Sequence, residues 1–268
     1  MIDLEFALTK AKEAAFEAGK IVLDICNKKD FCTEYKADGS PVTKADKEAE
    51  EKILEILLTA FPQHSFRGEE AGLIGSAGSS YLWTCDPVDG TRAILNGEKT
   101  SSISLALSND NNTILGLVYN PFTKEMYSAA ENIKTMLNDM HLPKQNKESP
   151  ENSVYNFQIS SSRKLDVLAL YGLWETKKIG KLVSSGGSVA YSLAQVAEGA
   201  HNVYVLSSRK IPEIWDVEAG IYLVRSVGGE VTNFNDKGVM VASTNPILHK
   251  KTLELLRSIN FDNIYQAR

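Results

Sequence analysis

The chain has 268 residues, of which 43% are hydrophobic and 24% charged, as in a globular protein with one large domain or two modest ones. Its 29 basic and 34 acidic side chains give a net charge of −5, which argues against a nucleic-acid polymer as partner. The three cysteines form no Cys-x-x-Cys pair, so we expect a reducing, cytoplasmic location. No apolar run approaches the roughly 20 residues of a membrane span, so no membrane partner is expected.

In the first part of the chain, apolar residues at helical spacing predict one helix from Leu4 to Ile25 and a second from Thr43 to about Ala60. Thr43 and Asp46 have the spacing of a capping box, which alone would give Asp46 a structural role. Residues 71–80, rich in Gly, Ser and Ala, predict a mobile loop. The strands expected in this part are Gln63–Phe66, Tyr81–Cys85, Ser101–Ser108, Thr113–Tyr119 and Glu125–Ala129.

The polar, proline-bearing segment 146–152 is the best candidate for a domain boundary. We therefore expect residues 1–148 to form an α+β half and residues 149–268 an α/β half, because strands and helices alternate after the boundary. The strands expected there are Tyr155–Ser160, Lys181–Ser184, His201–Leu206, Glu230–Asn233 and Met240–Ala242. The helices expected there are Leu165–Trp174, Ser188–Ala197, Trp215–Val227 and Pro246–Ile259.

Two carboxylates, Asp86 and Asp89, directly follow the predicted buried strand that ends at Cys85. Buried carboxylates are costly unless they are paired or bind metal, and Mg²⁺ takes oxygen ligands. The stretch fits a Mg²⁺ site at this strand end, and it fits equally an Asp-Pro turn followed by an Asp-Gly turn. Glu69 also follows a predicted strand, although a solvated acidic loop would explain it. Asp216, beside Trp215 at a predicted helix start, could be only a favourable N-terminal charge.

Together these segments resemble the inositol monophosphatase family of Mg²⁺-dependent, lithium-sensitive phosphatases. The resemblance spans the whole chain in the family's order, and it favours functional roles for Glu69, Asp46 and Asp216 over the structural ones. The matching blocks are Pro41–Asp46, Gly68–Glu70, Trp83–Thr91, Ser185–Gly199 and Trp215–Gly220. It implies an α/β fold of stacked layers, the αβαβα sandwich of this family, and a homodimer.

The resemblance also implies the site residues. The implied metal ligands are Glu69, Asp86, the carbonyl of Val88, Asp89 and Asp216, which would hold two Mg²⁺ ions bridged by Asp86, or three ions. The implied catalytic residues are Asp46, Thr91 and Glu69, of which Asp46 and Thr91 would orient the attacking water. The implied substrate-side residues are Gly90, Thr91, Gly187, Ser188, Arg209 and Asp216. Metal-activated water would attack phosphorus, since two closely spaced ions can stabilise an in-line displacement.

The resemblance implies a small phosphorylated metabolite as substrate, with an inositol monophosphate first. The block Asp38–Thr43 resembles the nucleotidases that act on phosphoadenosine phosphate, and Thr91-Arg92 resembles histidinol phosphatases. Fructose bisphosphate also stays open. Arg209 falls where inositol-selective members carry a glutamate, and a guanidinium suits a second phosphate, although a solvated loop explains Arg209 equally well. An alternative of another class is a non-catalytic protein that binds a phosphate ligand on the same fold.

Overall fold

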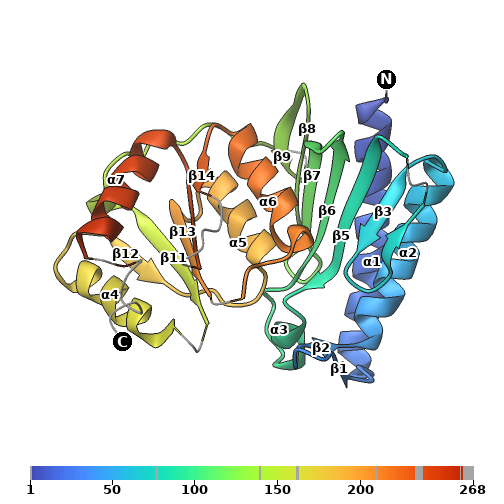
Figure 1. The fold of residues 1–268 in the computed structure, drawn as a ribbon, viewed down its shortest axis with the longest axis horizontal. Helices are drawn as coiled ribbons and strands as arrows, with labels where there is room; N and C mark the ends of the chain where they lie inside the picture. The colour runs from blue at the N-terminus through green and yellow to red at the C-terminus, as the bar shows by residue number, and fades with distance from the viewer. Residues whose placement is uncertain are drawn as a thin grey trace. The chain divides into compact units, whose positions relative to one another are not determined.

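The computed structural model describes residues 2–75, 78–138, 140–160, 163–208, 210–232, 238–259 and 261. By their internal contacts, the residues form two compact units (Figure 1). Unit 1 comprises Met1–His141, Gly187–Tyr191 and Ile214–Leu223, and unit 2 comprises Leu142–Gly186, Ser192–Glu213 and Val224–Arg268. Two short segments from the predicted second half therefore belong to unit 1. The predicted division after residue 148 stays a prediction.

Unit 1 begins with two long helices, α1 (Leu4–Lys28) and α2 (Lys44–Ala60), which confirm the two predicted N-terminal helices. The Asp3 side chain caps α1 by accepting from the Phe6 N–H. Thr43 and Asp46 form the predicted capping box of α2. Alanines on the inner faces of both helices allow them to pack closely against each other and against one face of a large sheet.

The sheet of unit 1 has eight strands in the order β10-β9-β8-β7-β6-β5-β3-β4 (Figure 1). All neighbours pair antiparallel except β3 and β5, which pair parallel. The strands are β3 (Ser65–Gly68), β4 (Gly72–Ile74), β5 (Tyr81–Asp89), β6 (Ser102–Asn109), β7 (Asn112–Asn120), β8 (Glu125–Ala130), β9 (Ile133–Leu137) and β10 (Met140–His141). A separate two-stranded sheet joins β1 (Glu34–Tyr35) to β2 (Pro41–Val42).

The large sheet has unexpected strands in two places. The segment 71–80 was expected to be a loop, but its first part forms β4, because a hairpin pairs Gly68 with Gly72. Residues 76–77 of this segment lie outside the described residues. The antiparallel meander also continues beyond its third strand, since β9 and β10 extend it. The three added strands are short and lie at or next to an edge of the sheet.

Strand β5 is longer than predicted, since it runs through both aspartates to Asp89 instead of ending at Cys85. Its pairing with β6 shifts register here: Asp86 lies opposite Ser104 and Asp89 opposite Ser102. Three steps on β5 therefore match two steps on β6, as in a β-bulge. In a regular strand, residues three apart point to opposite faces of the sheet. The extra residue lets the side chains of Asp86 and Asp89 reach the same site.

The second face of the large sheet is covered by the first part of helix α6 (Ile214–Ser226). The Ser104 hydroxyl of β6 donates to the Trp215 carbonyl oxygen at 2.9 Å. The Glu218 carboxylate accepts from the hydroxyls of Ser108 and Thr113 on β6 and β7. These bonds fix the first turn of α6 over β6, and Asp216 is in that turn. Helix α3 (Thr91–Leu95) follows β5 directly.

Unit 2 has a five-stranded sheet in the order β12-β11-β13-β15-β14, which is parallel across β12, β11 and β13 and antiparallel beyond. Its core packs the sheet against α4 and α7. The strands are β11 (Val154–Ile159), β12 (Lys181–Val183), β13 (Val203–Ser207), β14 (Glu230–Thr232) and β15 (Val239–Ser243). The helices are η1 (Pro150–Asn152), α4 (Lys164–Glu175), most of α5 (Val189–Glu198) and α7 (Pro246–Ser258). Among the described residues, no helix is both long and apolar enough to cross a bilayer.

Candidate functional site

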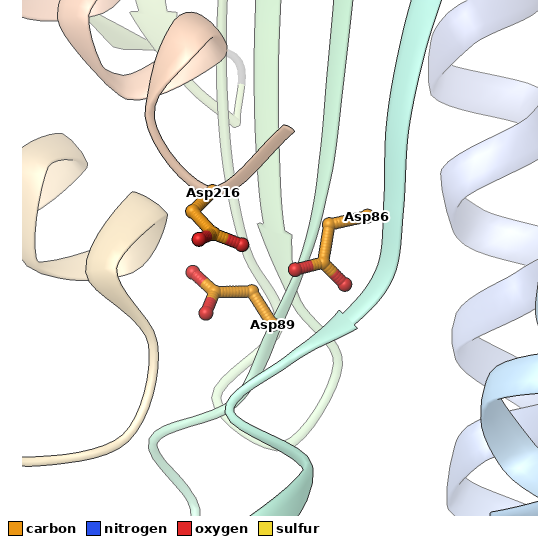
Figure 2. A group of neighbouring side chains, drawn as sticks. All are labelled: Asp86, Asp89 and Asp216. Carbon is orange, nitrogen blue, oxygen red and sulfur yellow. The ribbon is translucent and has the colours of Figure 1, made fainter. Parts of the chain in front are cut away.

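Three carboxylates meet in unit 1, at the end of β5 and the start of α6 (Figure 2). One oxygen each from Asp86, Asp89 and Asp216 lies within 4.8 Å of the others. Asp86 and Asp89 are 2% and 7% exposed. The bulge in β5 and the attachment of α6 to β6 together bring these side chains to one point. The structure thus assembles three of the predicted ligands from two distant segments.

Asp89 is held from one side by the first turn of α5. The Ser188 hydroxyl donates to Asp89 Oδ2 at 2.6 Å, and the Ala190 N–H donates to the same oxygen at 2.7 Å. Because both donors use Oδ2, Asp89 keeps Oδ1 as a potential ligand atom. The Ser188 hydroxyl also accepts from the Tyr191 N–H at 2.8 Å, and the Ser188 N–H donates to the Thr100 carbonyl at 2.9 Å. Ser188, predicted on the substrate side, therefore orients Asp89.

The parallel pairing of β3 with β5 brings Glu69 next to Asp86. Gly68 lies opposite Cys85, and the Glu69 N–H donates to the Cys85 carbonyl at 3.2 Å. The Glu69 carboxylate is not part of the three-carboxylate group; it accepts from Lys36 Nζ at 2.7 Å. The same ammonium bonds Glu70 at 2.6 Å. In this structure the single ammonium of Lys36 is therefore shared between these two glutamates.

The electrostatics of the group favour a cation. The pKa of Asp86 lies well above its usual value because of burial and then the nearby carboxylates of Glu69, Asp89 and Asp216. Burial and then Asp216 raise the pKa of Asp89, against the stabilising bonds from Ser188 and Ala190. Such a set of oxygen donors at close range suits a divalent cation of the Mg²⁺ type, which would remove the mutual repulsion. The residues present therefore fit the predicted metal.

Asp46 and Thr91 form a partly buried connection beside the three carboxylates. Asp46 Oδ2 accepts from the N–H and the hydroxyl of Thr43 at 2.7 and 2.6 Å. Asp46 Oδ1 accepts from the Thr91 hydroxyl at 2.9 Å, and this hydroxyl also lies 3.1 Å from the Val88 carbonyl. Burial raises the pKa of Asp46 to about 6. Asp46 therefore caps α2 with one oxygen and contacts Thr91 with the other. The structural role in the capping box and the expected functional role beside Thr91 are thus compatible.

Two glycines close the chain tightly around the site. Gly90 has a φ of +89°, and a Cβ there would lie 2.9 Å from the Ser188 nitrogen. Gly187 has a φ of +72°, and its Cβ would lie 2.2 Å from Thr100 Oγ1. Only glycine adopts this conformation in such a small space. Val88 is buried, and its N–H donates to Asp86 Oδ1 at 2.9 Å. Arg209, the remaining predicted residue, lies outside the described residues.

Sequence reasoning missed two charged residues at this site, Lys36 and Glu50. Glu50 is 2% exposed and accepts from the N–H groups of Glu70 and Ala71. Burial and then the Glu70 and Glu69 carboxylates raise the pKa of Glu50 to about 7, although these two N–H bonds favour its charged form. Its signal in the sequence is its place on the buried face of α2, one turn after Asp46, where an apolar residue is expected. Lys36 has no comparable signal, because lysines are common in polar loops.

The fold and the site define an α/β protein with a buried, carboxylate-lined candidate metal centre. A family model described as the inositol monophosphatase family matches residues 3–261. The chain therefore belongs to the inositol monophosphatase family.

Known proteins extend this likeness over nearly the whole chain. A fructose-1,6-bisphosphatase/inositol-1-monophosphatase of Aquifex aeolicus is 30% identical over 262 residues, 96% of this chain and 97% of the relative. A Nus factor SuhB of Pasteurella multocida is 30% identical over 237 residues, 85% of each chain. A solved inositol monophosphatase from an Anabaena (Nostoc) species superposes with a TM-score of 0.78 at 26% identity, covering 96% of this chain and 97% of that structure. The predicted α/β fold class is thereby confirmed.

Proposed function

We propose that the chain is a Mg²⁺-dependent phosphomonoesterase that hydrolyses a small phosphate ester, with an inositol monophosphate as first choice. The observation that carries this proposal is the group of Asp86, Asp89 and Asp216, whose oxygens lie within 4.8 Å of one another in a chain of this family. Together with Glu69 and the Val88 carbonyl, these three aspartates would hold two Mg²⁺ ions. When bound, Mg²⁺ would neutralise the ester dianion and lower the pKa of the attacking water.

Thr91 and Asp46 would orient that water. The Thr91 hydroxyl donates to Asp46 Oδ1 and lies near the Val88 carbonyl, so its hydrogen is already engaged within the protein. Its oxygen lone pairs can therefore accept a hydrogen bond from the water. As the water attacks phosphorus, the bond from phosphorus to the ester oxygen would break, while a water proton passes to Thr91 Oγ1 and the Thr91 proton moves to Asp46. The alcohol would leave as an alkoxide and take up a proton from solvent. Asp46 would be the final acceptor of that proton.

The peptide around Gly90 and Thr91 would bind the phosphate oxygens. A Cβ at Gly90 would lie 2.9 Å from the Ser188 nitrogen, so the two segments pass close to each other, and α3 begins at Thr91. Gly187 would likewise allow the chain just before α5 to pass close to Thr100. Ser188 would act through Asp89, since its N–H and hydroxyl both have partners within the protein. Asp216 would bind the metal and also contact the leaving group of the substrate. Arg209 would contact the rest of the substrate.

A second candidate substrate is fructose 1,6-bisphosphate, which is favoured by the name of the Aquifex aeolicus relative. The nucleotidase and histidinol phosphatase alternatives rest on the motif resemblance alone. The Pasteurella multocida relative bears the name Nus factor, which does not name a phosphatase, so the alternative of a non-catalytic binding protein is included in the test below. We extend the proposal to lithium sensitivity, a third ion near Glu69 and a homodimer, which all rest on the family resemblance. A cytoplasmic location is also proposed, and it rests on the cysteine pattern.

The deciding experiment measures inorganic phosphate released from inositol 1-phosphate, fructose 1,6-bisphosphate, phosphoadenosine phosphate and histidinol phosphate. Each ester is assayed with Mg²⁺, with EDTA and with Mg²⁺ plus Li⁺. We expect release from inositol 1-phosphate to be Mg²⁺-dependent and to have the highest kcat/KM. A higher kcat/KM for another ester would replace the proposed substrate. No release from any of them would favour the binding-protein alternative.

Removal of divalent metal is expected to lower the melting temperature. The pKa values of Asp86 and Asp89 are raised in the folded, metal-free chain, so the folded state binds protons more tightly than the unfolded state. The free energy of unfolding therefore falls as the pH rises above about 4, and Mg²⁺ offsets this loss. At a Mg²⁺ concentration about 100 times Kd, we expect a rise of about 5–10 °C by calorimetry at pH 8. The rise should be smaller at pH 5, where protons compete. Identical melting temperatures in EDTA and Mg²⁺ would contradict a metal site.

A further inference from the structure

Glu50 is a buried carboxylate that does not belong to the three-carboxylate group. It lies on α2, on the face that packs against the sheet, and is 2% exposed. Its oxygens bond the backbone on the far side of Glu69: Oε1 accepts from the Glu70 N–H at 3.1 Å, and Oε2 accepts from the Ala71 N–H. A buried carboxylate normally needs a cation or a metal, whereas this one is bound by two peptide groups.

The same carboxylate also touches the backbone on the near side of Glu69. A Cβ placed on Gly68 would lie 2.1 Å from Glu50 Oε1 and 2.5 Å from its Cδ. A side chain at position 68 would therefore displace the Glu50 carboxylate from its place against the loop. Gly68 and Gly72 are the closing pair of the β3–β4 hairpin, so Glu69, Glu70 and Ala71 form its loop. Glu50 thus contacts this loop on both sides of Glu69.

Besides these contacts of Glu50 on either side of Glu69, β5 also holds the Glu69 backbone. The Glu69 N–H donates to the Cys85 carbonyl of β5. Its side chain, in contrast, is bonded only to Lys36 among the contacts described here, and Lys36 is shared with Glu70. A metal can replace an ammonium as partner of Glu69 without any backbone change. The position of the Glu69 carboxylate is then set by the loop, and the loop is set by Glu50.

We propose that Glu50 is a positioning residue for the metal site: it fixes the loop that carries Glu69 next to Asp86 and does not itself bind the ion. This inference rests on the proposed function, in which Glu69 is a metal ligand. The two oxygens of a carboxylate match the two adjacent N–H groups of the loop. A glutamine in its place can accept at only one oxygen, and its amide N–H₂ would face the other N–H group. Loss of such a supporting contact typically weakens metal binding about 10–100-fold.

The test compares Glu50→Gln with Glu51→Gln, a matched change at the next residue of α2, which is exposed. Mn²⁺ binding is measured by electron paramagnetic resonance titration without substrate, alongside the Mg²⁺ dependence of phosphate release and the melting temperature. For Glu50→Gln we expect about 10-fold weaker Mn²⁺ binding and a similar rise in the Mg²⁺ concentration for half-maximal rate. The kcat at saturating Mg²⁺ should stay close to that of the unchanged protein, since the ligands themselves are retained. Glu51→Gln should change none of these values.

A Glu50→Gln protein that binds Mn²⁺ as tightly as the unchanged protein would overturn the proposal. So would an equal loss of kcat at saturating metal, because Glu50 would then act in the chemistry. A crystal structure of the unchanged protein with Mn²⁺ tests the idea even if the variants do not fold. Glu69 must bind the ion while Glu50 keeps both backbone bonds, and an ion bound by Glu50 would overturn it. If the unchanged protein binds Mn²⁺ but hydrolyses no ester, the proposed function fails while the Mn²⁺ comparison still decides the role of Glu50.

Discussion

Replacement of Asp89 with asparagine is expected to reduce phosphate release on the order of 10³-fold or more, while the protein stays folded. The amide oxygen of asparagine can still accept from the Ser188 hydroxyl and the Ala190 N–H, which both bind Asp89 Oδ2. The amide N–H₂ would then take the place of Oδ1. A hydrogen-bond donor without negative charge would face Asp86 and Asp216, where a metal ligand is needed. The substitution therefore changes charge at nearly constant volume.

Turnover at saturating Mg²⁺, the Mn²⁺ affinity and the melting temperature in EDTA should be measured for this variant. In EDTA, Asp89→Asn should be at least as stable as the unchanged chain, since it removes one of several repelling anions. Asp110→Asn in the exposed β6–β7 turn is the matched control and should keep full activity. Near-normal turnover of Asp89→Asn in saturating Mg²⁺ would contradict its assignment as a ligand.

Local signals predicted the helical part of unit 1 well. Thr43 and Asp46 are cap residues whose partners lie within one turn of the same helix. Such bonds depend on spacing alone, so they can be read from the sequence. The long meander strands were equally clear, because the turn Asn109–Asn112 separates two apolar runs.

The geometry of the three carboxylates could not be derived from local patterns. The bulge between Asp86 and Asp89 depends on the pairing with β6, which no property of the β5 sequence specifies. Proline at position 87 is consistent with a break in the ladder, since it has no N–H, but it does not fix the register. Asp216 joins them only because Ser104 and Ser108 attach α6 to the sheet. Family resemblance supplied what spacing could not.

Glu50 and Ser188 show the other limit of sequence reasoning. Both were placed by tertiary contacts with segments far along the chain: Glu50 with the β3–β4 loop, and Ser188 with Asp89. The family resemblance implied a substrate-side place for Ser188, and in the structure its hydroxyl contacts Asp89, Tyr191 and Ser102. A helix start can bind an anion of the protein itself as well as one of a ligand. Sequence cannot distinguish the two cases.

Thr91→Ala is expected to lower kcat roughly 10²-fold, with a much smaller change in KM. The Thr91 hydroxyl contacts Asp46 and the Val88 carbonyl, and its free lone pairs would align the attacking water. That alignment matters most in the transition state, so its loss should affect kcat more than substrate binding. The backbone N–H of residue 91 is unchanged in the variant, so phosphate binding should be largely kept. Steady-state kinetics at saturating Mg²⁺ would measure both constants.

Thr91→Ser separates the hydroxyl from the methyl group and provides the control. Serine can donate to Asp46 in the same way, so most of the kcat should return, whereas a purely packing role of the threonine would leave Ser and Ala equally impaired. Asp46→Asn should resemble Thr91→Ala in kcat, because an amide cannot accept the proton that the relay delivers. A change confined to KM in Thr91→Ala would mean that Thr91 only binds phosphate. Asp46 would then keep its role as the cap of α2, and another group would have to take the proton from the water.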